Sequence, residues 1–158
     1  MNNKIIIKKK LESGYQSEVY IIELEGTLFI RKKSPITDIN PKNFSIPLWR
    51  EIDMSLFINK LSKDKIIFFM KTIDFKIIKC DGIYTDFSKL NSIQVKTNKC
   101  LEVIYEYKGN TIDNLLLKQH MKLKERYIMI IQIIHALNIL KKGGYIHNDL
   151  HSRNITYS

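Results

Sequence analysis

The stretch Lys124–Lys142 constrains the fold more than any other part of this 158-residue chain. From Tyr127 to Leu140 nearly every residue is apolar, and the polar exceptions Gln132, His135 and Asn138 recur at three-residue spacing. The pattern predicts one long helix with a narrow polar stripe, which needs cover over most of its circumference. The expected cover comes either from later helices that would follow this chain in a longer protein, or from another chain.

Chemically useful side chains follow the helix in one short segment, His147–Asn154. Gly143-Gly144 predicts the end of the helix, and the segment then offers the Asp149 carboxylate and, five positions later, the Asn154 carboxamide. Phosphoryl transfer needs a carboxylate to accept the proton of the attacking hydroxyl, and an oxygen ligand for a magnesium ion. A loop that aims both groups into one cleft could supply these two functions.

Two other interpretations account for the same residues. Asp149 and Asn154 can make an Asx turn and a cap, as these residue types do in many loops. Alternatively, His147, Asp149 and His151 alternate along an extended segment and share one face. Imidazole and carboxylate ligands suit zinc or iron, so the second arrangement would be a metal site.

The first part of the chain predicts three strands joined by turns. β-Branched runs indicate strands at Lys4–Leu11, Val19–Leu24 and Leu28–Lys33. The first turn contains Gly14 and the small Ser17. Such a hairpin can fold over a nucleotide and present backbone N–H groups to its phosphates, although an ordinary hairpin turn explains the same residues.

The third strand becomes basic where it ends. Alternation places Phe29 and Arg31 on one face of that strand and Lys32 on the other. A proline-containing loop follows, and apolar residues at helical spacing then predict a helix over Leu48–Leu61, which carries Glu51. A strand end and a helix surface in solvent would also account for these charges.

Later segments alternate between β-prone and polar composition. Ile66–Lys79 is expected to include a strand, and Asp81–Lys99 to be a loop or a connection between strands. Cys100–Tyr107 predicts another strand ending before a glycine turn, and a short helix is expected over Ile112–Leu117.

Composition excludes several classes of protein. The net charge is +10, but it comes mostly from scattered lysines, which indicates a solvated surface and no nucleic-acid partner. Cys80 and Cys100 form no C-x-x-C pattern and are expected to be free thiols in a reducing compartment, with one disulfide left open. No signal-peptide core or membrane span is expected, so the predicted location is the cytoplasm.

In chain order, these segments resemble the protein-kinase-like superfamily: a glycine hairpin, a basic strand, a helix with a glutamate, a hinge strand, an apolar helix and an H-x-D-x-x-x-x-N loop. The resemblance covers almost the whole chain. It implies an α+β fold, with a kinase-like N-lobe of antiparallel sheet plus one helix at 1–107. The first part of a helical C-lobe would occupy 108–158.

The resemblance also implies residues that bind ATP. These are Gly14, Val19, Arg31, Lys32, Glu51, Glu106 and Tyr107. In the family a strand cation holds the α- and β-phosphates, and a helix glutamate pairs with that cation. Since Phe29 is taken to face the nucleotide, Arg31 is favoured over Lys32, and an Arg31–Glu51 ion pair is expected. The backbone around Glu106 and Tyr107 would bond the adenine, and Val19 would lie over it.

The catalytic roles implied by the resemblance fall in the last segment. Asp149 would accept the proton of the attacking hydroxyl, and Asn154 would bind magnesium. His151 stands where common protein kinases have a lysine that contacts the transferred phosphate. The implied cofactors are ATP and Mg²⁺, and the implied acceptor is a serine or threonine hydroxyl of a protein.

Two departures widen the interpretation. The form Asp149-Leu150-His151 is more similar to atypical, viral and small-molecule kinases; a viral protein would act in the host cytoplasm. The D-F-G segment, whose Asp holds magnesium, is not found before Ser158. This chain alone is therefore expected to be inactive, and a truncated pseudokinase acting as a nucleotide-binding or interaction module is an alternative, as is a small-molecule kinase.

Overall fold

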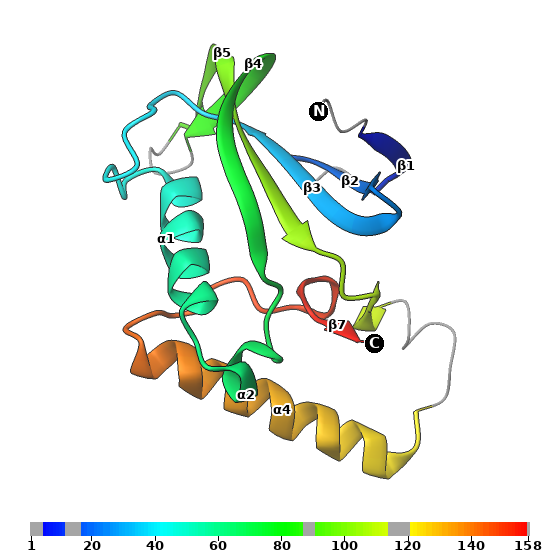
Figure 1. Cartoon of the computed structure of the whole chain (residues 1–158). Helices are drawn as coiled ribbons and strands as arrows, with labels where there is room; N and C mark the ends of the chain where they lie inside the picture. Colours follow the sequence, from blue (N-terminus) through cyan, green and yellow to red (C-terminus); the bar gives the residue numbers. More distant parts are fainter. Residues whose placement is uncertain (1–4, 12–16, 87–90, 114–120, 158) are drawn as a thin grey trace. The chain divides into compact units, whose positions relative to one another are not determined.

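The structure is a computed structural model that describes residues 5–11, 17–86, 91–113 and 121–157 (Figure 1). The chain divides into two compact units, of which the first comprises Met1–Leu56 and Lys71–Tyr107. The second comprises Phe57–Met70 and Lys108–Ser158. It therefore includes residues 57–70, which the sequence-based division at 107 had assigned to the first.

The first unit is built on a five-stranded antiparallel sheet with the order β1-β2-β3-β5-β4 (Figure 1). Its strands are β1 (Ile6–Lys10), β2 (Glu18–Leu24), β3 (Thr27–Pro35), β4 (Thr72–Asp86) and β5 (Ile93–Glu106). The turn between β2 and β3 is formed by Glu25 and Gly26, which have φ angles of 50° and 78°. Positive φ at both central residues suits the tight hairpin that the right-handed twist of the strands favours.

β4 and β5 form a long hairpin that was only partly foreseen. The segment Asp81–Lys99 was expected to be a loop or a connection, but both of its ends pair, from Gly82 opposite Thr97 to Asp86 opposite Ile93. The register shifts between Lys79 and Gly82. At this bulge a Cβ on Gly82 would come within 2.7 Å of the Pro35 ring, so only glycine allows the close approach.

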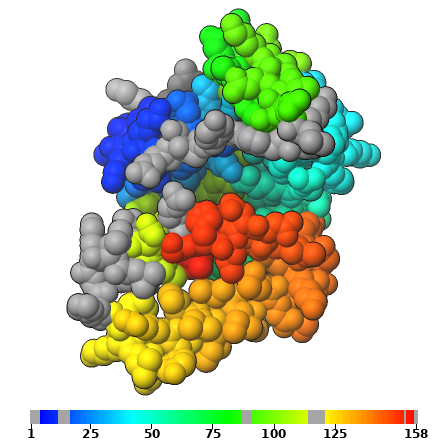
Figure 2. Space-filling view, turned by 180° about the vertical axis from the view of Figure 1, so that it is seen from behind, coloured from blue at the N-terminus to red at the C-terminus, as the bar shows by residue number. Residues whose placement is uncertain are grey.

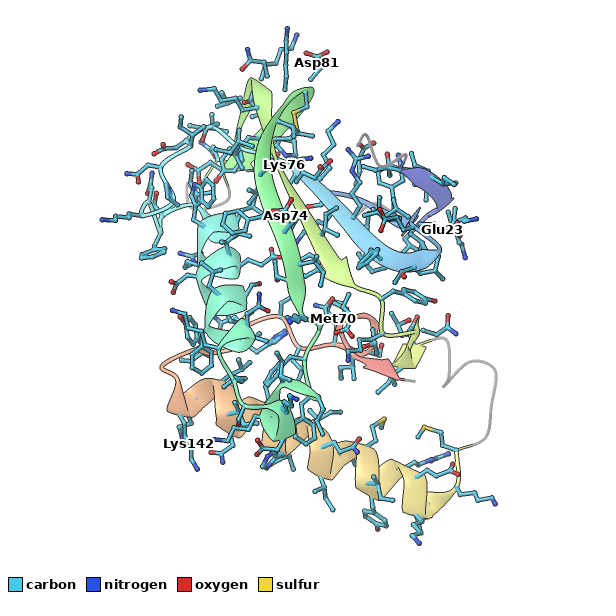
Figure 3. The ribbon with its side chains drawn as sticks, in the orientation of Figure 1. Glu23, Met70, Asp74, Lys76, Asp81 and Lys142 are labelled. Carbon is cyan, nitrogen blue, oxygen red and sulfur yellow. A yellow bond between two sulfur atoms is a disulfide. The ribbon has the colours of Figure 1, made fainter. Side chains whose placement is uncertain are left out.

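Cys80 and Cys100 form a disulfide, so the expectation of free thiols was wrong (yellow bond in Figure 3). Their Cα atoms are 5.8 Å apart across β4 and β5. The spacing in the sequence gave no signal for this bond, because pairing of the two strands is what brings the thiols together. Both residues are buried, at 8% and 2% exposure.

One helix covers the sheet of the first unit. α1 (Pro47–Asn59) begins at Pro47, whose fixed φ and missing N–H suit a first helical position. The core cluster consists of Ile36, Ile46, Trp49, Ile52, Tyr84, Leu101, Val103 and Tyr105. It joins the inner face of α1 to alternate residues of β5, which is the arrangement expected of a strand with one face buried.

The second unit is mainly helical. Its elements are α2 (Lys63–Ile66), β6 (Asn110–Thr111), α4 (Leu123–Lys142), the 3₁₀ turn η1 (Ser152–Asn154) and β7 (Thr156–Tyr157). β6 pairs with β7, which fixes the segment after α4. Figure 2 shows α4, in yellow to orange, alongside that segment, in orange to red. The expected helix over Ile112–Leu117 lies mostly outside the described residues.

α4 confirms the predicted helix and its glycine stop. The Tyr145 N–H bonds the Leu140 carbonyl at 2.9 Å, and the Gly144 N–H bonds Lys141 at 3.0 Å, with Gly144 at φ 84°. This is the Schellman arrangement, which needs a left-handed residue just after the helix. Within the described residues, no helix is long and apolar enough to cross a membrane.

Candidate functional site

Lys32, and not Arg31, is the strand cation that pairs with Glu51. The Lys32 Nζ atom lies 2.8 Å from Glu51 Oε1 and 2.7 Å from Oε2. The expected Arg31–Glu51 pair is therefore wrong, although the cation is one residue away from the predicted one. Both side chains of the observed pair are partly exposed, at 24% for Lys32 and 31% for Glu51.

The error came from the assumed orientation of β3. Ile30 packs against the core cluster under α1, so the even-numbered residues of β3 face the helix. Lys32 shares that face with Val19, its directly paired neighbour on β2. Phe29 and Arg31 lie on the opposite face. Which face of β3 is buried against the core therefore determines whether Arg31 or Lys32 reaches α1.

Tyr105 of β5 completes the ion pair. Its hydroxyl donates a hydrogen bond to Glu51 Oε1 at 2.7 Å. Burial, together with the neighbouring charge of Glu51, raises the pKa of the Tyr105 phenol well above its usual range. Tyr105 therefore remains a neutral donor at physiological pH, and Glu51 accepts hydrogen bonds from two different strands.

Arg31 has a different partner on the other face of the sheet. Its Nε atom lies 2.5 Å from Glu102 Oε2, and its Nη2 atom also contacts that oxygen. Lys76 of β4 (labelled in Figure 3) approaches Glu102 Oε1 at 3.3 Å. The Glu102 side chain is only 3% exposed, so the two cations compensate a carboxylate that has lost its hydration.

For the other residues predicted to bind the nucleotide, the structure gives only local contacts or no description. Gly14 lies outside the described residues. Nearby, the Ser17 and Ser34 hydroxyls are 2.6 Å apart, which ties the start of β2 to β3. The Glu106 N–H donates to the Lys71 carbonyl at 2.9 Å. Tyr107, the next residue, is the last of the first unit.

In the second unit, Asp149 and Asn154 come together as their spacing predicted. Asn154 Nδ2 lies 2.8 Å from the Asp149 carbonyl and 3.1 Å from its Oδ2. The Asp149 side chain is 82% exposed, and His151 Nε2 lies 3.7 Å from the same Oδ2. The Ser152 hydroxyl bonds the Asp113 carboxylate at 2.9 Å, which anchors the loop beside β6.

This geometry bears on the other two interpretations of the loop. The bonds from Asn154 to Asp149 are those of a loop-closing turn, so the structural role exists whatever the chemistry is. The same bonds use the amide nitrogen and leave the carboxamide oxygen, a ligand suited to Mg²⁺, on the other side of the group. In the described part of the chain no three His, Cys, Asp or Glu side chains gather as a metal site. The His147–Asp149–His151 site is therefore not formed.

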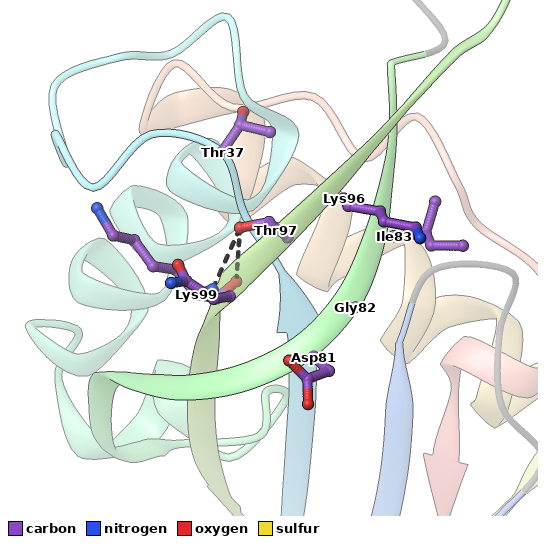
Figure 4. A pocket seen from close by; sticks show the side chains of 8 residues that line it. Thr37, Asp81, Gly82, Ile83, Lys96, Thr97 and Lys99 are labelled. Atoms are coloured by element: carbon purple, nitrogen blue, oxygen red, sulfur yellow. Dashed lines mark hydrogen bonds between the residues drawn. The ribbon is translucent and has the colours of Figure 1, made fainter.

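A pocket in the first unit lies elsewhere, beside the bulge of the β4–β5 hairpin (Figure 4). It is lined by Thr37, Asp81, Gly82, Ile83, Lys96, Thr97, Asn98 and Lys99. The Thr97 hydroxyl bonds the Ile36 carbonyl at 2.6 Å, which fixes one wall. None of the residues predicted from the sequence lines this pocket.

Comparisons with known proteins show which fold the chain has. No protein-family model and no curated protein matches the sequence. Among solved structures, the crystal structure of the PF14_0431 kinase domain is similar, with a TM-score of 0.64 and 17% identity. The chain has a protein-kinase-like fold. The similarity covers 99% of this chain but 40% of that kinase domain, so the chain spans less than half of its structural neighbour.

The kinase-like fold fits the elements described above. The antiparallel sheet with α1 has the organisation of a kinase N-lobe, and the second unit that of part of the helical lobe. The α+β fold class predicted from the sequence is thus confirmed. At 17% identity the likeness concerns the fold, and the chemistry has to be argued from the residues.

Two polar residues near the ion pair were not among the site residues predicted from the sequence. They are Tyr105 of β5 and Ser55 of α1. A signal was present, because Tyr105 has the same strand parity as the apolar Leu101 and Val103. A tyrosine that faces the core must find a partner for its hydroxyl, and Glu51 lies on the helix covering that face.

Proposed function

We propose that the protein is an ATP-dependent phosphotransferase of the protein-kinase type, which uses Mg²⁺ and transfers phosphate to a serine or threonine hydroxyl of a protein. The observation that carries this proposal is the Lys32–Glu51 ion pair on the face of the sheet covered by α1. The kinase-like fold and the Asp149–Asn154 loop support it.

Lys32 is the group proposed to bind phosphate. Its ammonium has three N–H donors, and Glu51 occupies two of them. The third is free to bond a phosphate oxygen, while the carboxylate keeps the ammonium in position. Val19, which shares the face of Lys32, offers an apolar contact for a base.

The loop supplies the groups proposed to act on the acceptor and the metal. When bound, ATP provides the phosphoryl group and Mg²⁺ neutralises charge on its oxygens. The exposed Asp149 carboxylate would accept the proton of the acceptor hydroxyl, and the Asn154 carboxamide oxygen would hold the metal. His151, next to Asp149, is placed to add positive charge there when it is protonated.

A binding experiment with matched lysines tests the nucleotide site. Lys32→Ala is expected to weaken Mg-ATP binding about 10- to 100-fold, the value of a lost charge-assisted hydrogen bond. Lys33→Ala is the control, because Lys33 is the adjacent residue on the other face of β3 with nearly equal exposure, 27% against 24%. Calorimetry gives both affinities. No ATP binding by the wild-type chain, or equal losses in both variants, would contradict the proposal.

Asp149→Asn tests the proton acceptor. In a version of the protein that also carries a D-F-G segment, the substitution is expected to lower phosphoryl transfer about 10²- to 10⁴-fold, as loss of a positioned general base does, while the affinity for ATP stays nearly unchanged. Asp64→Asn, an exposed carboxylate of α2 in the same unit, is the matched control. Transfer of ³²P from labelled ATP to protein serine and threonine measures the rate. A rate for the Asp149 variant within a few-fold of wild type would remove Asp149 from the mechanism.

A further inference from the structure

We propose that the Tyr105 hydroxyl is a positioning group for nucleotide binding, which holds Glu51 so that the Lys32 ammonium stays where a phosphate can meet it. The inference rests on the proposed function, since Lys32 is the phosphate-binding group there. It assigns to a neutral core residue a role in affinity for the charged part of the ligand.

The geometry around the Glu51 carboxylate carries the inference. Oε1 accepts from Tyr105 at 2.7 Å and from Lys32 at 2.8 Å, and Oε2 accepts from Lys32 at 2.7 Å. Glu51 and Lys32 are both long side chains with partial exposure, so their contact alone leaves the pair free to move together. A third, rigid donor is what fixes the pair in space.

Tyr105 has the rigidity that this role needs. It is 8% exposed and belongs to the core cluster with Trp49 and Val103, so packing holds its ring. Tyr105 pairs directly with Ile30, two residues before Lys32, so the donor and the cation stand on neighbouring strands of one sheet. The hydroxyl is therefore anchored in the same frame as the lysine.

Ser55 adds a second tie from α1. It lies one helical turn after Glu51 on the same face of the helix. Its side chain also hydrogen-bonds the Tyr105 hydroxyl and is itself 6% exposed. Two residues of α1, four positions apart, thus meet one hydroxyl of β5, which sets the rotation of the helix as well as the position of the carboxylate.

This role predicts an effect that depends on the ligand. Tyr105 acts through Glu51 and Lys32, which meet only the phosphates, so loss of its hydroxyl should weaken ATP and spare adenosine. A tyrosine that served packing alone would, when altered, weaken both ligands alike. The ratio of the two affinities therefore separates positioning from packing.

The experiment compares Tyr105→Phe with Tyr84→Phe by calorimetry, using Mg-ATP and adenosine. Tyr84 is the matched control, because it is another buried tyrosine of the same core cluster. Tyr105→Phe is expected to weaken ATP about 3- to 10-fold, part of the value of a hydrogen bond to a charged group, and to change adenosine less than about 2-fold. Tyr84→Phe should leave both unchanged.

A double-mutant cycle locates the effect. In a Glu51→Ala background, Tyr105→Phe should add little, because the acceptor through which the hydroxyl acts is already gone. Ser55→Ala, which leaves the ring in place, should shift the ATP affinity in the same direction by a smaller factor. Additive effects of the Tyr105 and Glu51 substitutions would overturn the inference.

The outcomes distinguish this inference from the proposed function. If Lys32→Ala weakens ATP but Tyr105→Phe keeps the wild-type ratio of ATP to adenosine affinity, the positioning role is wrong and the phosphate site stands. If the wild-type chain binds neither ligand, the proposed function fails and the positioning role falls with it. Equal weakening of ATP and adenosine by Tyr105→Phe assigns Tyr105 to packing and also contradicts the inference.

Discussion

Glu102 shows how much can depend on one side chain. Its carboxylate is almost completely buried in β5, and the cations that compensate it, Arg31 and Lys76, come from the two flanking strands. Removing one partner of a buried charge pair is costly, because the other charge remains without compensation. The arrangement therefore joins three adjacent strands through a single residue.

Glu102→Ala is accordingly expected to lower the free energy of unfolding by about 2 to 3 kcal/mol, less than for a fully buried pair because Arg31 is 23% exposed. Glu23→Ala is the control, since Glu23 forms a partly exposed pair with Lys8 at 2.8 Å and pairs near the surface contribute about 1 kcal/mol or less. Urea unfolding measures both. Similar losses in the two variants would show that the Glu102 cluster is no stronger than a surface pair.

At this scale the sequence predicted the types of residue and missed one orientation. Glu51, Asp149 and Asn154 occupy the predicted places on a helix and a loop, because their spacing is local. The choice between Arg31 and Lys32 failed, since alternation fixes relative faces only. Which face meets the helix depends on packing of Ile30 against the core, and that packing is set by residues far along the chain.

Among the elements, the β4–β5 hairpin departs most from expectation. In its outer half the apolar residues Ile83, Ile93 and Val95 are all substantially exposed, so they do not mark a face that is buried against a core. The strands nonetheless pair along almost their full length. Pairing with neighbouring strands and the Cys80–Cys100 disulfide stabilise this hairpin, although the local sequence does not predict its outer half.

The disulfide gives an element-scale prediction. It joins residues 20 apart, and closing a loop of that length stabilises the folded state by about 3 kcal/mol in the chain-entropy model. Dithiothreitol, or the double substitution Cys80→Ser and Cys100→Ser, should therefore lower the urea midpoint by the corresponding amount. Reaction of the native, unreduced protein with a thiol reagent would show that the cysteines are free and that the bond does not form.

For the whole molecule, the important feature is that α4 leaves much of its apolar surface exposed, as its sequence indicated. Leu123, Tyr127, Ile131 and Ile134 are between 60% and 67% exposed, and only Ile139 and Leu140 are buried. Fold class, order of elements and this apolar surface were predictable, because each follows from periodicity along the chain. The assignment of residues 57–70 to the second unit was not, since they are far along the chain from the other residues of that unit.

Replacing Ile131 and Ile134 by lysine tests that surface. Because both side chains are exposed, the double variant should change the free energy of unfolding by less than about 1 kcal/mol, while self-association and aggregation decrease. Ile139→Lys is the contrasting variant. Because Ile139 is 7% exposed, this substitution should lower the free energy of unfolding by several kcal/mol. Sedimentation velocity and urea unfolding give the two quantities. A large loss of stability in the double variant would show that these residues are covered.

The strand order also has a consequence for the rate of folding. β1, β2 and β3 are joined by local connections, and so are β4 and β5, but the seam between β3 and β5 pairs residues such as Arg31 and Ile104. Contacts between residues so far apart in the chain require closure of a long loop before they yield any stabilisation, which slows folding. The three-stranded meander and the hairpin are therefore expected to form first and to join late. The disulfide links two residues of the β4–β5 hairpin. It therefore does not shorten the loop that must close before β3 can pair with β5.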